Sequence, residues 1–224
     1  MQLQPGFAER ALLRMAAGGC DGVCGIREDR YMKGGQVVST CENYFGCTQE
    51  RVAPEFGGAV FLSAQALAGC GGWSPDTIAC EEAELHARLL AAGCTIIELP
   101  VPMIIHCDAV REERGLLSAV LSRRRLGEGQ AMRCAMSVHR ARAYVRLERE
   151  KFILYALDWL SLALLPAMGL RGLPAACFVQ MLQLGYLLAG RRPRAFVSAK
   201  LFFFAFPAGL VTYRRRGRGF TQVQ

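Results

Sequence analysis

A pair of adjacent carboxylates, Glu81 and Glu82, is the feature of this sequence best suited to chemistry. Both lie where a helical pattern begins, and the positive end of a helix dipole favours the ionised form of a carboxylate in the first turn. An ionised carboxylate can accept a proton, which is the task of a general base. Acidic residues also open many helices without a catalytic role, so the residues by themselves leave both interpretations open.

Short alternating elements surround this carboxylate pair and predict an α/β layered fold. A helical pattern over residues 81–92 carries the pair and ends at Gly93, because glycine favours a helix stop. The other predicted elements are a helix over residues 7–17, strands over 21–26, 59–62, 95–99 and 103–106, and a short helix over 64–68 capped by Ser63. The strand over 59–62 is expected to be buried on both faces. Residues 31–45 stay ambiguous.

The second half of the chain has a different composition, which divides the protein into two parts. Of the 224 residues, 52% are apolar, which is high for a soluble protein of this size. The excess lies in residues 152–170, 173–189 and 195–213, each close to the ~20 residues that cross a bilayer core. We therefore expect these three stretches to be membrane segments.

Polar residues inside the apolar segments suggest contacts between helices. Asp158 is the one charged residue of the first segment. A carboxylate inside a membrane segment is costly to bury, so Asp158 is a candidate functional residue. Gln180 and Gln183 in the second segment can hydrogen-bond to a neighbouring helix. Lys200 and Pro207 interrupt the third segment.

The net charge of +8 comes mainly from arginines that flank the apolar segments. This distribution suits anionic lipid headgroups and the positive-inside tendency. Nucleic-acid binding is the weaker interpretation, because the aromatic residues lie inside the apolar segments and not among the arginines. Residues 110–150 are expected to form basic amphipathic interfacial helices. The arginine positions favour two full spans, a re-entrant or interfacial third segment, and a cytoplasmic C-terminus.

The ten cysteines give no metal-binding pattern, since no C-x-x-C occurs and only three histidines accompany them. We expect them to be reduced and to serve as small apolar core residues.

Taken in order, the motifs between Gly57 and His106 resemble those of the family 2 glycosyltransferases of the GT-A fold, in the second half of the catalytic domain. That family has a Gly-Gly apolar strand, a Gly-Gly-aromatic turn, an acidic pair opening a helix, a Gly, a strand ending in Pro, and a His. Here the order reads Gly57–Leu62, Gly71-Gly72-Trp73, Glu81-Glu82-Ala83-Glu84-Leu85 with Arg88-Leu89, Gly93, Pro100 and His106. The likeness covers residues 4–126.

The resemblance implies transfer of a sugar, with inversion, from a nucleotide-sugar to a lipid-linked or envelope glycan, with Glu82 as the base beside Glu81. Gly57 and Gly58 would let donor or acceptor approach the backbone, or would simply form the turn into the strand.

Four further residues have an implied binding role and a plainer alternative. Trp73 would stack on a sugar or fill its loop. Arg123 and Arg124 would hold a diphosphate or lipid phosphate, or contact headgroups. His106 would lie near the diphosphate and assist the metal, or be a core histidine at a strand end.

Two departures from the family pattern matter. Glu82 stands where the family has Asp, and the chain contains no D-x-D motif. The Mg²⁺ or Mn²⁺ expected for the complete enzyme would be held mainly by that motif. We therefore expect this chain by itself to bind UDP-sugar only weakly.

The predicted organisation is a partial GT-A (Rossmann-like) α/β domain over residues 1–109, lacking its N-terminal nucleotide-binding half. Interfacial helices over 110–150, membrane segments over 151–213 and a basic tail over 214–224 follow. The predicted location is the plasma (inner) membrane, multi-pass, with the catalytic part in the cytoplasm. The alternative is a non-catalytic membrane protein, either a truncated relic or a partner of a full-length transferase.

Overall fold

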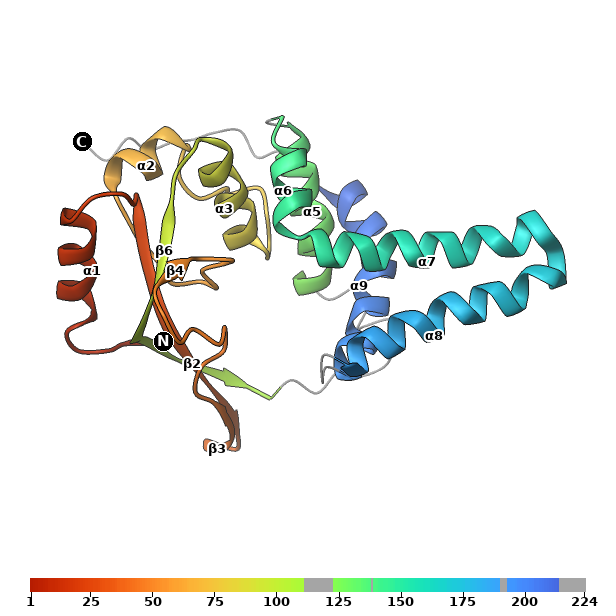
Figure 1. Cartoon of the computed structure of the whole chain (residues 1–224), viewed down its shortest axis with the longest axis horizontal. Coiled ribbons are helices and arrows are strands. Elements are labelled where there is room, and N and C mark those ends of the chain that lie inside the picture. The colour runs from red at the N-terminus through yellow and green to blue at the C-terminus, as the bar shows by residue number, and fades with distance from the viewer. Residues whose placement is uncertain (111–122, 138, 190–192, 214–224) are drawn as a thin grey trace. The chain divides into compact units, whose positions relative to one another are not determined.

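The computed structural model describes residues 1–110, 123–137, 139–189 and 193–213. The chain forms two compact units. The first, here called the sheet unit, comprises Met1–Ser74 and Glu82–Glu113, and the second, the helical unit, comprises Pro75–Glu81 and Arg114–Gln224. Figure 1 shows the elements of both.

A mixed sheet of six strands forms the centre of the sheet unit within the described residues. Its main strands, β2 (Gly22–Lys33) and β6 (Ile96–Ala109), run parallel to each other. The remaining strands pair antiparallel with them: β1 (Gln2–Leu3) and β4 (Arg51–Val52) with β6, and β3 (Gln36–Cys41) and β5 (Phe61–Leu62) with β2. The mixed α/β class predicted from the sequence is therefore confirmed.

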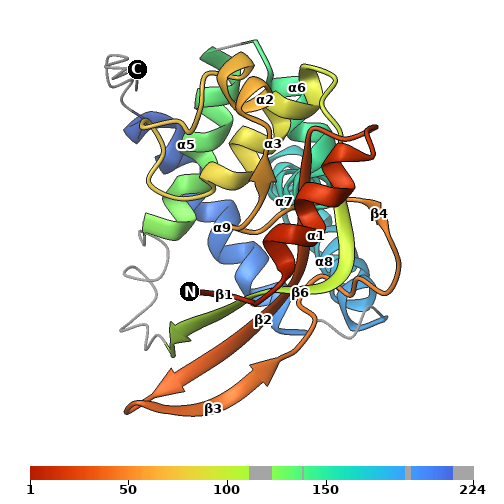
Figure 2. The same ribbon diagram turned by 90° about the vertical axis from the view of Figure 1, so that its left-hand side faces the viewer.

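Among the residues that the structure describes, three helices accompany the sheet, and each agrees with a sequence prediction. They are α1 (Phe7–Ala16), α2 (Ala64–Gly69) and α3 (Glu81–Ala91). Ser63 caps α2 as expected, because its side-chain oxygen accepts a hydrogen bond from the backbone N–H of Ala66 at 3.1 Å. Figures 1 and 2 show α1 and α3 on opposite sides of β2.

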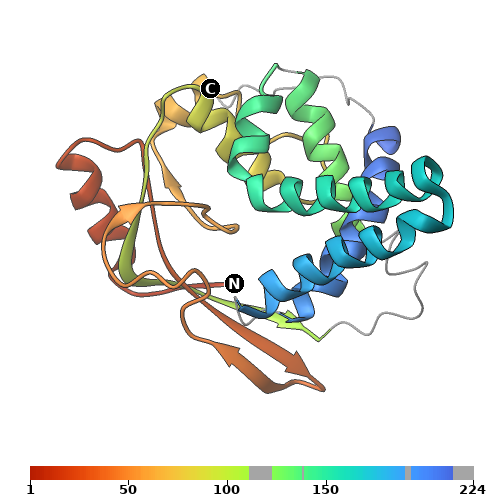
Figure 3. The same cartoon turned by 45° about the vertical axis from the view of Figure 1, so that its right-hand side comes forward.

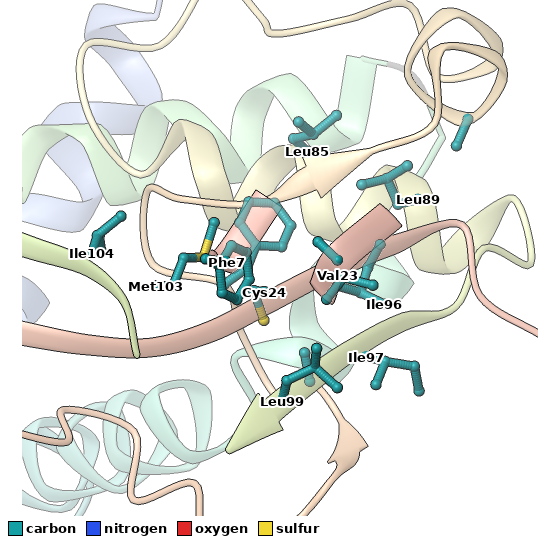
Figure 4. Close-up of a cluster of buried hydrophobic side chains, with 14 residues drawn as sticks. Phe7, Val23, Cys24, Leu85, Leu89, Ile96, Ile97, Leu99, Met103 and Ile104 are labelled. Carbon is teal, nitrogen blue, oxygen red and sulfur yellow. The ribbon is translucent and has the colours of Figure 1, made fainter. Parts of the chain in front are cut away.

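The apolar core of the sheet unit joins both helices to the two long strands (Figure 4). Phe7 of α1 and Leu85 and Leu89 of α3 are fully buried, together with Val23 of β2 and Ile96 of β6. Helix α3, which carries the carboxylate pair, is thus fixed by the same core that joins β2 to β6.

Gly25 of β2 is needed for this packing, because a methyl group there would lie 2.5 Å from the Phe7 ring and 2.7 Å from the Val101 carbonyl oxygen. We expect Gly25→Ala to lower the free energy of unfolding by about 1–3 kcal/mol through overpacking. Gly69→Ala, at the end of α2 where nothing lies within 4 Å, is the control and should leave stability unchanged or slightly raised. Equal midpoints for the two variants in thermal unfolding would contradict this.

The strands differ from the prediction in three ways. The predicted strand over 59–62 is reduced to Phe61–Leu62 and is only half-buried, so the expectation of burial on both faces was wrong. The strand predicted over 21–26 extends to Lys33 and turns at Gly34 and Gly35 into β3, which resolves the ambiguous region as a hairpin. The two pieces around Pro100 form one strand, β6, whose pairing with β2 shifts register beside the prolines.

The helical unit consists mainly of α5 (Arg123–Ser137), α6 (Ala141–Leu147), α7 (Arg149–Met168), the 3₁₀ turn η1 (Gly169–Gly172), α8 (Leu173–Ala189) and α9 (Pro193–Thr212). Figures 1 and 3 show α7 and α8 side by side as a hairpin. The expected amphipathic helix over 110–126 lies mostly outside the described residues, as does the basic tail over 214–224.

In the part of the chain that the structure describes, one helical stretch, Arg149–Ala189, is long and apolar enough to cross a membrane. It comprises α7, η1 and α8. Large apolar side chains point outward along both helices, including Ile153, Trp159, Leu160, Leu162, Phe178, Met181, Leu182, Tyr186 and Leu188. Such a surface is costly to hydrate, so an apolar environment suits it better than water.

Candidate functional site

The structure brings Glu82 and Gly58 together, although 24 positions separate them along the chain. Glu82 lies in the first turn of α3, as predicted. Gly58 has a φ of 86°, and a Cβ atom built there would lie 3.1 Å from Oε1 of Glu82. Gly58 therefore leaves room at the Glu82 carboxylate that any side chain would fill.

Gly57 is held by an arginine of the sheet. Its φ is 47°, and its carbonyl oxygen accepts a hydrogen bond from Nη1 of Arg27 at 2.7 Å. A side chain at this position would overlap the ring of Phe45. Arg27 thus fixes the backbone of the Gly57-Gly58 turn at the point where the turn meets Glu82.

Arg27 also joins this turn to His106 through Asp29. The guanidinium group donates to both carboxylate oxygens of Asp29, at 2.6 and 3.0 Å. Nδ1 of His106 lies 3.1 Å from Oδ1 of Asp29 and 3.2 Å from Nη2 of Arg27. Tyr44 completes the group, with the guanidinium carbon 4.9 Å from its ring centroid.

The parallel pairing of β2 with β6 explains this arrangement. In that register Asp29 lies opposite His106. Arg27 and Asp29 are two positions apart on one strand, so their side chains project from the same face. The structure therefore connects Glu82, Gly58, Gly57 and His106 in one continuous group of contacts.

Sequence reasoning did not include Arg27, Asp29 and Tyr44 in the site. The predicted strand over 21–26 ends before both charged residues, and only the extension of β2 to Lys33 places Arg27 and Asp29 at alternate positions on one face. Asp29 is also 97% buried, which for a carboxylate requires a partner.

The remaining predicted residues, Trp73, Glu81, Arg123 and Arg124, have no part in the contacts described above for the Glu82, Gly58 and Arg27 group. Trp73 is 43% exposed, with its ring packed edge-on against Phe56 at 6.3 Å. Glu81 begins α3 but falls in the helical unit, since the division lies between Glu81 and Glu82. Arg123 and Arg124 begin α5, and their side chains lie outside the described residues.

The loop before Glu82, Pro75–Glu81, packs with α5 and α9 of the helical unit. The backbone N–H of Ile78 donates to Oε1 of Gln130 at 3.2 Å, and the hydroxyl of Tyr213 donates to Asp76 at 3.1 Å. Gly127 of α5 lies directly against Ala79, since a methyl group there would be 2.6 Å from its Cβ. Pro75–Glu81 is therefore held by contacts within the helical unit.

The residues around His106 do not fit a divalent cation. No group of three or more His, Cys, Asp or Glu side chains with metal-binding geometry occurs among the described residues. The nearby carboxylate of Asp29 already binds the Arg27 guanidinium, whose positive charge would repel a metal ion at this point. The metal-binding role of His106 stays a prediction that rests on the family resemblance.

His86 of α3 is a second histidine of the sheet unit, and its surroundings are apolar. Its side chain is buried, its ring centroid lies 5.0 Å from that of Phe56, and neither ring nitrogen has a hydrogen-bond partner in the described structure. Burial lowers the pKa of His86 to about 4. His86 is thus a neutral core residue.

This burial predicts an acid-sensitive sheet unit. The unfolded chain binds a proton at His86 below about pH 6.5, whereas the folded chain does so only near pH 4. The free energy of unfolding should therefore fall by about 3 kcal/mol as the pH falls from 6.5 to below 4. In His86→Leu this contribution should vanish, as measured by urea unfolding followed by Trp73 fluorescence in a Trp159→Phe background. An unchanged acid dependence in His86→Leu would contradict the assignment.

Comparisons with known proteins identify no relative: no family model, no curated protein and no solved structure matches the chain.

Proposed function

We propose that this chain is the acceptor-side part of a membrane-bound glycosyltransferase of family 2, with a partial GT-A fold. It would transfer a sugar from a nucleotide-sugar to a lipid-linked or envelope glycan. The observation that carries the proposal is the approach of Gly58 to the Glu82 carboxylate, in a turn that Arg27 fixes and connects to His106. The order of motifs from Gly57 to His106 supports the same conclusion.

The chemistry follows from the Glu82 carboxylate beside the Gly57-Gly58 turn. Glu82 accepts the proton of the acceptor hydroxyl as that oxygen bonds to the anomeric carbon of the sugar. The bond from this carbon to the diphosphate oxygen breaks, and its electron pair leaves with the nucleoside diphosphate. Because the hydroxyl attacks opposite the leaving group, the anomeric configuration inverts.

The Arg27, Asp29 and His106 group would serve this reaction by holding the turn in place. The guanidinium group uses its donors on Asp29 and on the Gly57 carbonyl, so it orients protein groups and does not need a ligand of its own. A rigid turn keeps Glu82 at a fixed distance from the acceptor, and fixed geometry accounts for much of enzymatic rate enhancement.

The apolar hairpin supports attachment to a membrane. Helix α7 has 20 residues and α8 has 17, so at 1.5 Å per residue they are about 30 and 25 Å long, close to the thickness of a bilayer core. We propose that both span the inner membrane, with Arg149 and the arginines after Ala189 on the cytoplasmic side. The third segment would be re-entrant or interfacial, which places the C-terminus in the cytoplasm.

The proposal is tested with native membranes that contain the protein, supplied with radiolabelled UDP-, GDP- and dTDP-sugars. We expect label from one donor to enter a lipid-extractable or polymeric product, and membranes from a deletion strain to lack that incorporation. Equal incorporation in both membranes would favour the alternative, a non-catalytic membrane protein.

A further inference from the structure

Five polar residues meet inside the apolar helices of the helical unit, remote in the sequence from the candidate site. They are Asp158 and Ser161 of α7, Gln180 and Gln183 of α8, and Lys200 of α9. We refer to them as the polar network. Asp158 is 4% exposed and Gln183 is 1% exposed, although both helices present apolar side chains to the outside.

Lys200 is the member that connects α9 to the hairpin. Its ammonium group donates to Oδ1 of Asp158 and to the side-chain oxygen of Gln183. It thereby contacts α7 and α8 at once.

The glutamines complete the network from α8. The amide of Gln180 donates to Oδ1 of Asp158 at 3.1 Å and to the hydroxyl of Ser161 at 2.9 Å. The amide of Gln183 donates to the backbone carbonyl of Leu154 at 2.8 Å. Each glutamine therefore binds α7 through its amide nitrogen, and the side-chain oxygen of Gln183 accepts the hydrogen bond from Lys200.

Such a group is expensive in an apolar medium unless every charge has a partner. Removing one partner of a buried ion pair leaves an uncompensated charge, whereas removing both often costs little. Apolar contacts between α7 and α9 exist beside the network, since the rings of Trp159 and Phe203 are 5.2 Å apart. The network is thus not needed to supply attraction, but it restricts where α9 can pack.

We propose that the polar network is a positional lock: the Lys200–Asp158 pair fixes α9 at one register against the α7–α8 hairpin. A sliding or detached α9 would leave Lys200 and Asp158 as separate charges among apolar side chains. The observed arrangement pairs both charges and gives both glutamines hydrogen-bond partners, and other registers would separate the charges. This inference holds for the helical unit whether or not the sheet unit transfers sugar.

The chain offers a direct reporter of this packing, because it has two tryptophans and Trp159 lies against Phe203 of α9. In a Trp73→Phe background, Trp159 fluorescence is followed during SDS titration of the full chain in detergent micelles. The variants are Asp158→Asn, Lys200→Met, and the two combined. Arg171→Met is the control, since it removes a charge from the exposed turn η1 without touching the network.

We expect each single variant to shift Trp159 emission and to lower the SDS midpoint. The combined variant should recover most of that loss, and Arg171→Met should match the parent. The proposal is overturned if the combined variant loses as much as the two single variants added together, because the residues would then act as independent packing groups. It is also overturned if the single variants behave like the parent.

Discussion

Replacing Glu82 by Gln is expected to lower sugar transfer by roughly 10²–10⁴-fold while leaving donor binding intact. The amide has nearly the same shape as the carboxylate and fits the space beside Gly58, where the built Cβ lies 3.1 Å from Oε1. It cannot accept the proton of the acceptor hydroxyl at neutral pH. The effect should therefore appear in kcat of the transfer assay with native membranes, and not in KM for the donor.

Glu9→Gln is the matched control for this experiment. Glu9 is also an acidic residue in the first turn of a helix, α1, but it lies outside the candidate site and is exposed. Its replacement should leave transfer within about twofold of the parent, since surface changes of this kind rarely exceed 0.5 kcal/mol. Full activity of Glu82→Gln would remove Glu82 from the role of base.

Arg27→Met is expected to destabilise the sheet unit by about 3–5 kcal/mol, the usual cost of removing one partner from a buried pair. Asp29 is 3% exposed and receives two hydrogen bonds from Arg27, so the variant removes the guanidinium that contacts both oxygens of this buried carboxylate, while Nδ1 of His106 stays beside Oδ1. The Gly57 carbonyl loses its donor as well. Urea unfolding of the Trp159→Phe protein, monitored at Trp73, measures the change.

Strand β2 provides an internal comparison, because Arg30 pairs with Glu28 at 2.5 Å and both side chains are more exposed, at 39% and 26%. Arg30→Met should cost about 0–1 kcal/mol, as solvent-exposed pairs do. Combining Arg27→Met with Asp29→Leu should recover much of the stability lost in Arg27→Met. Similar losses for Arg27→Met and Arg30→Met would show that the buried pair has no special importance.

The local elements of the sheet unit could be predicted from the sequence because their signals are local. Gly18 and Gly19 end α1, Ser63 caps α2, and Gly93 ends α3, and each acts within a few residues of the helix it limits. The bounds of the strands are harder to predict from the sequence, because strand pairing depends on residues far away in the chain. Nothing near Phe61 indicates that only two residues pair with β2, or that β2 continues to Lys33.

The residues of the candidate site likewise fall into two groups, those that local sequence motifs predict and those that only the strand pairing brings together. Glu82, Gly57 and Gly58 could be selected from motif order, because each belongs to a short pattern. Arg27 and Asp29 could not, since their importance appears only when the parallel register of β2 and β6 places Asp29 opposite His106. Likewise, Asp158, Gln180 and Gln183 stand out in the sequence as polar residues in apolar segments. Their connection to Lys200 depends on the packing of three helices.

The anomeric configuration of the product tests the central claim most directly. Native membranes containing the protein are supplied with the donor that labels their product, and the new glycosidic bond is assigned by the proton coupling of the anomeric centre in NMR. A single base at Glu82 predicts a product whose anomeric configuration is opposite to that of the donor. Retention of configuration, or no product that depends on this protein, would contradict the account.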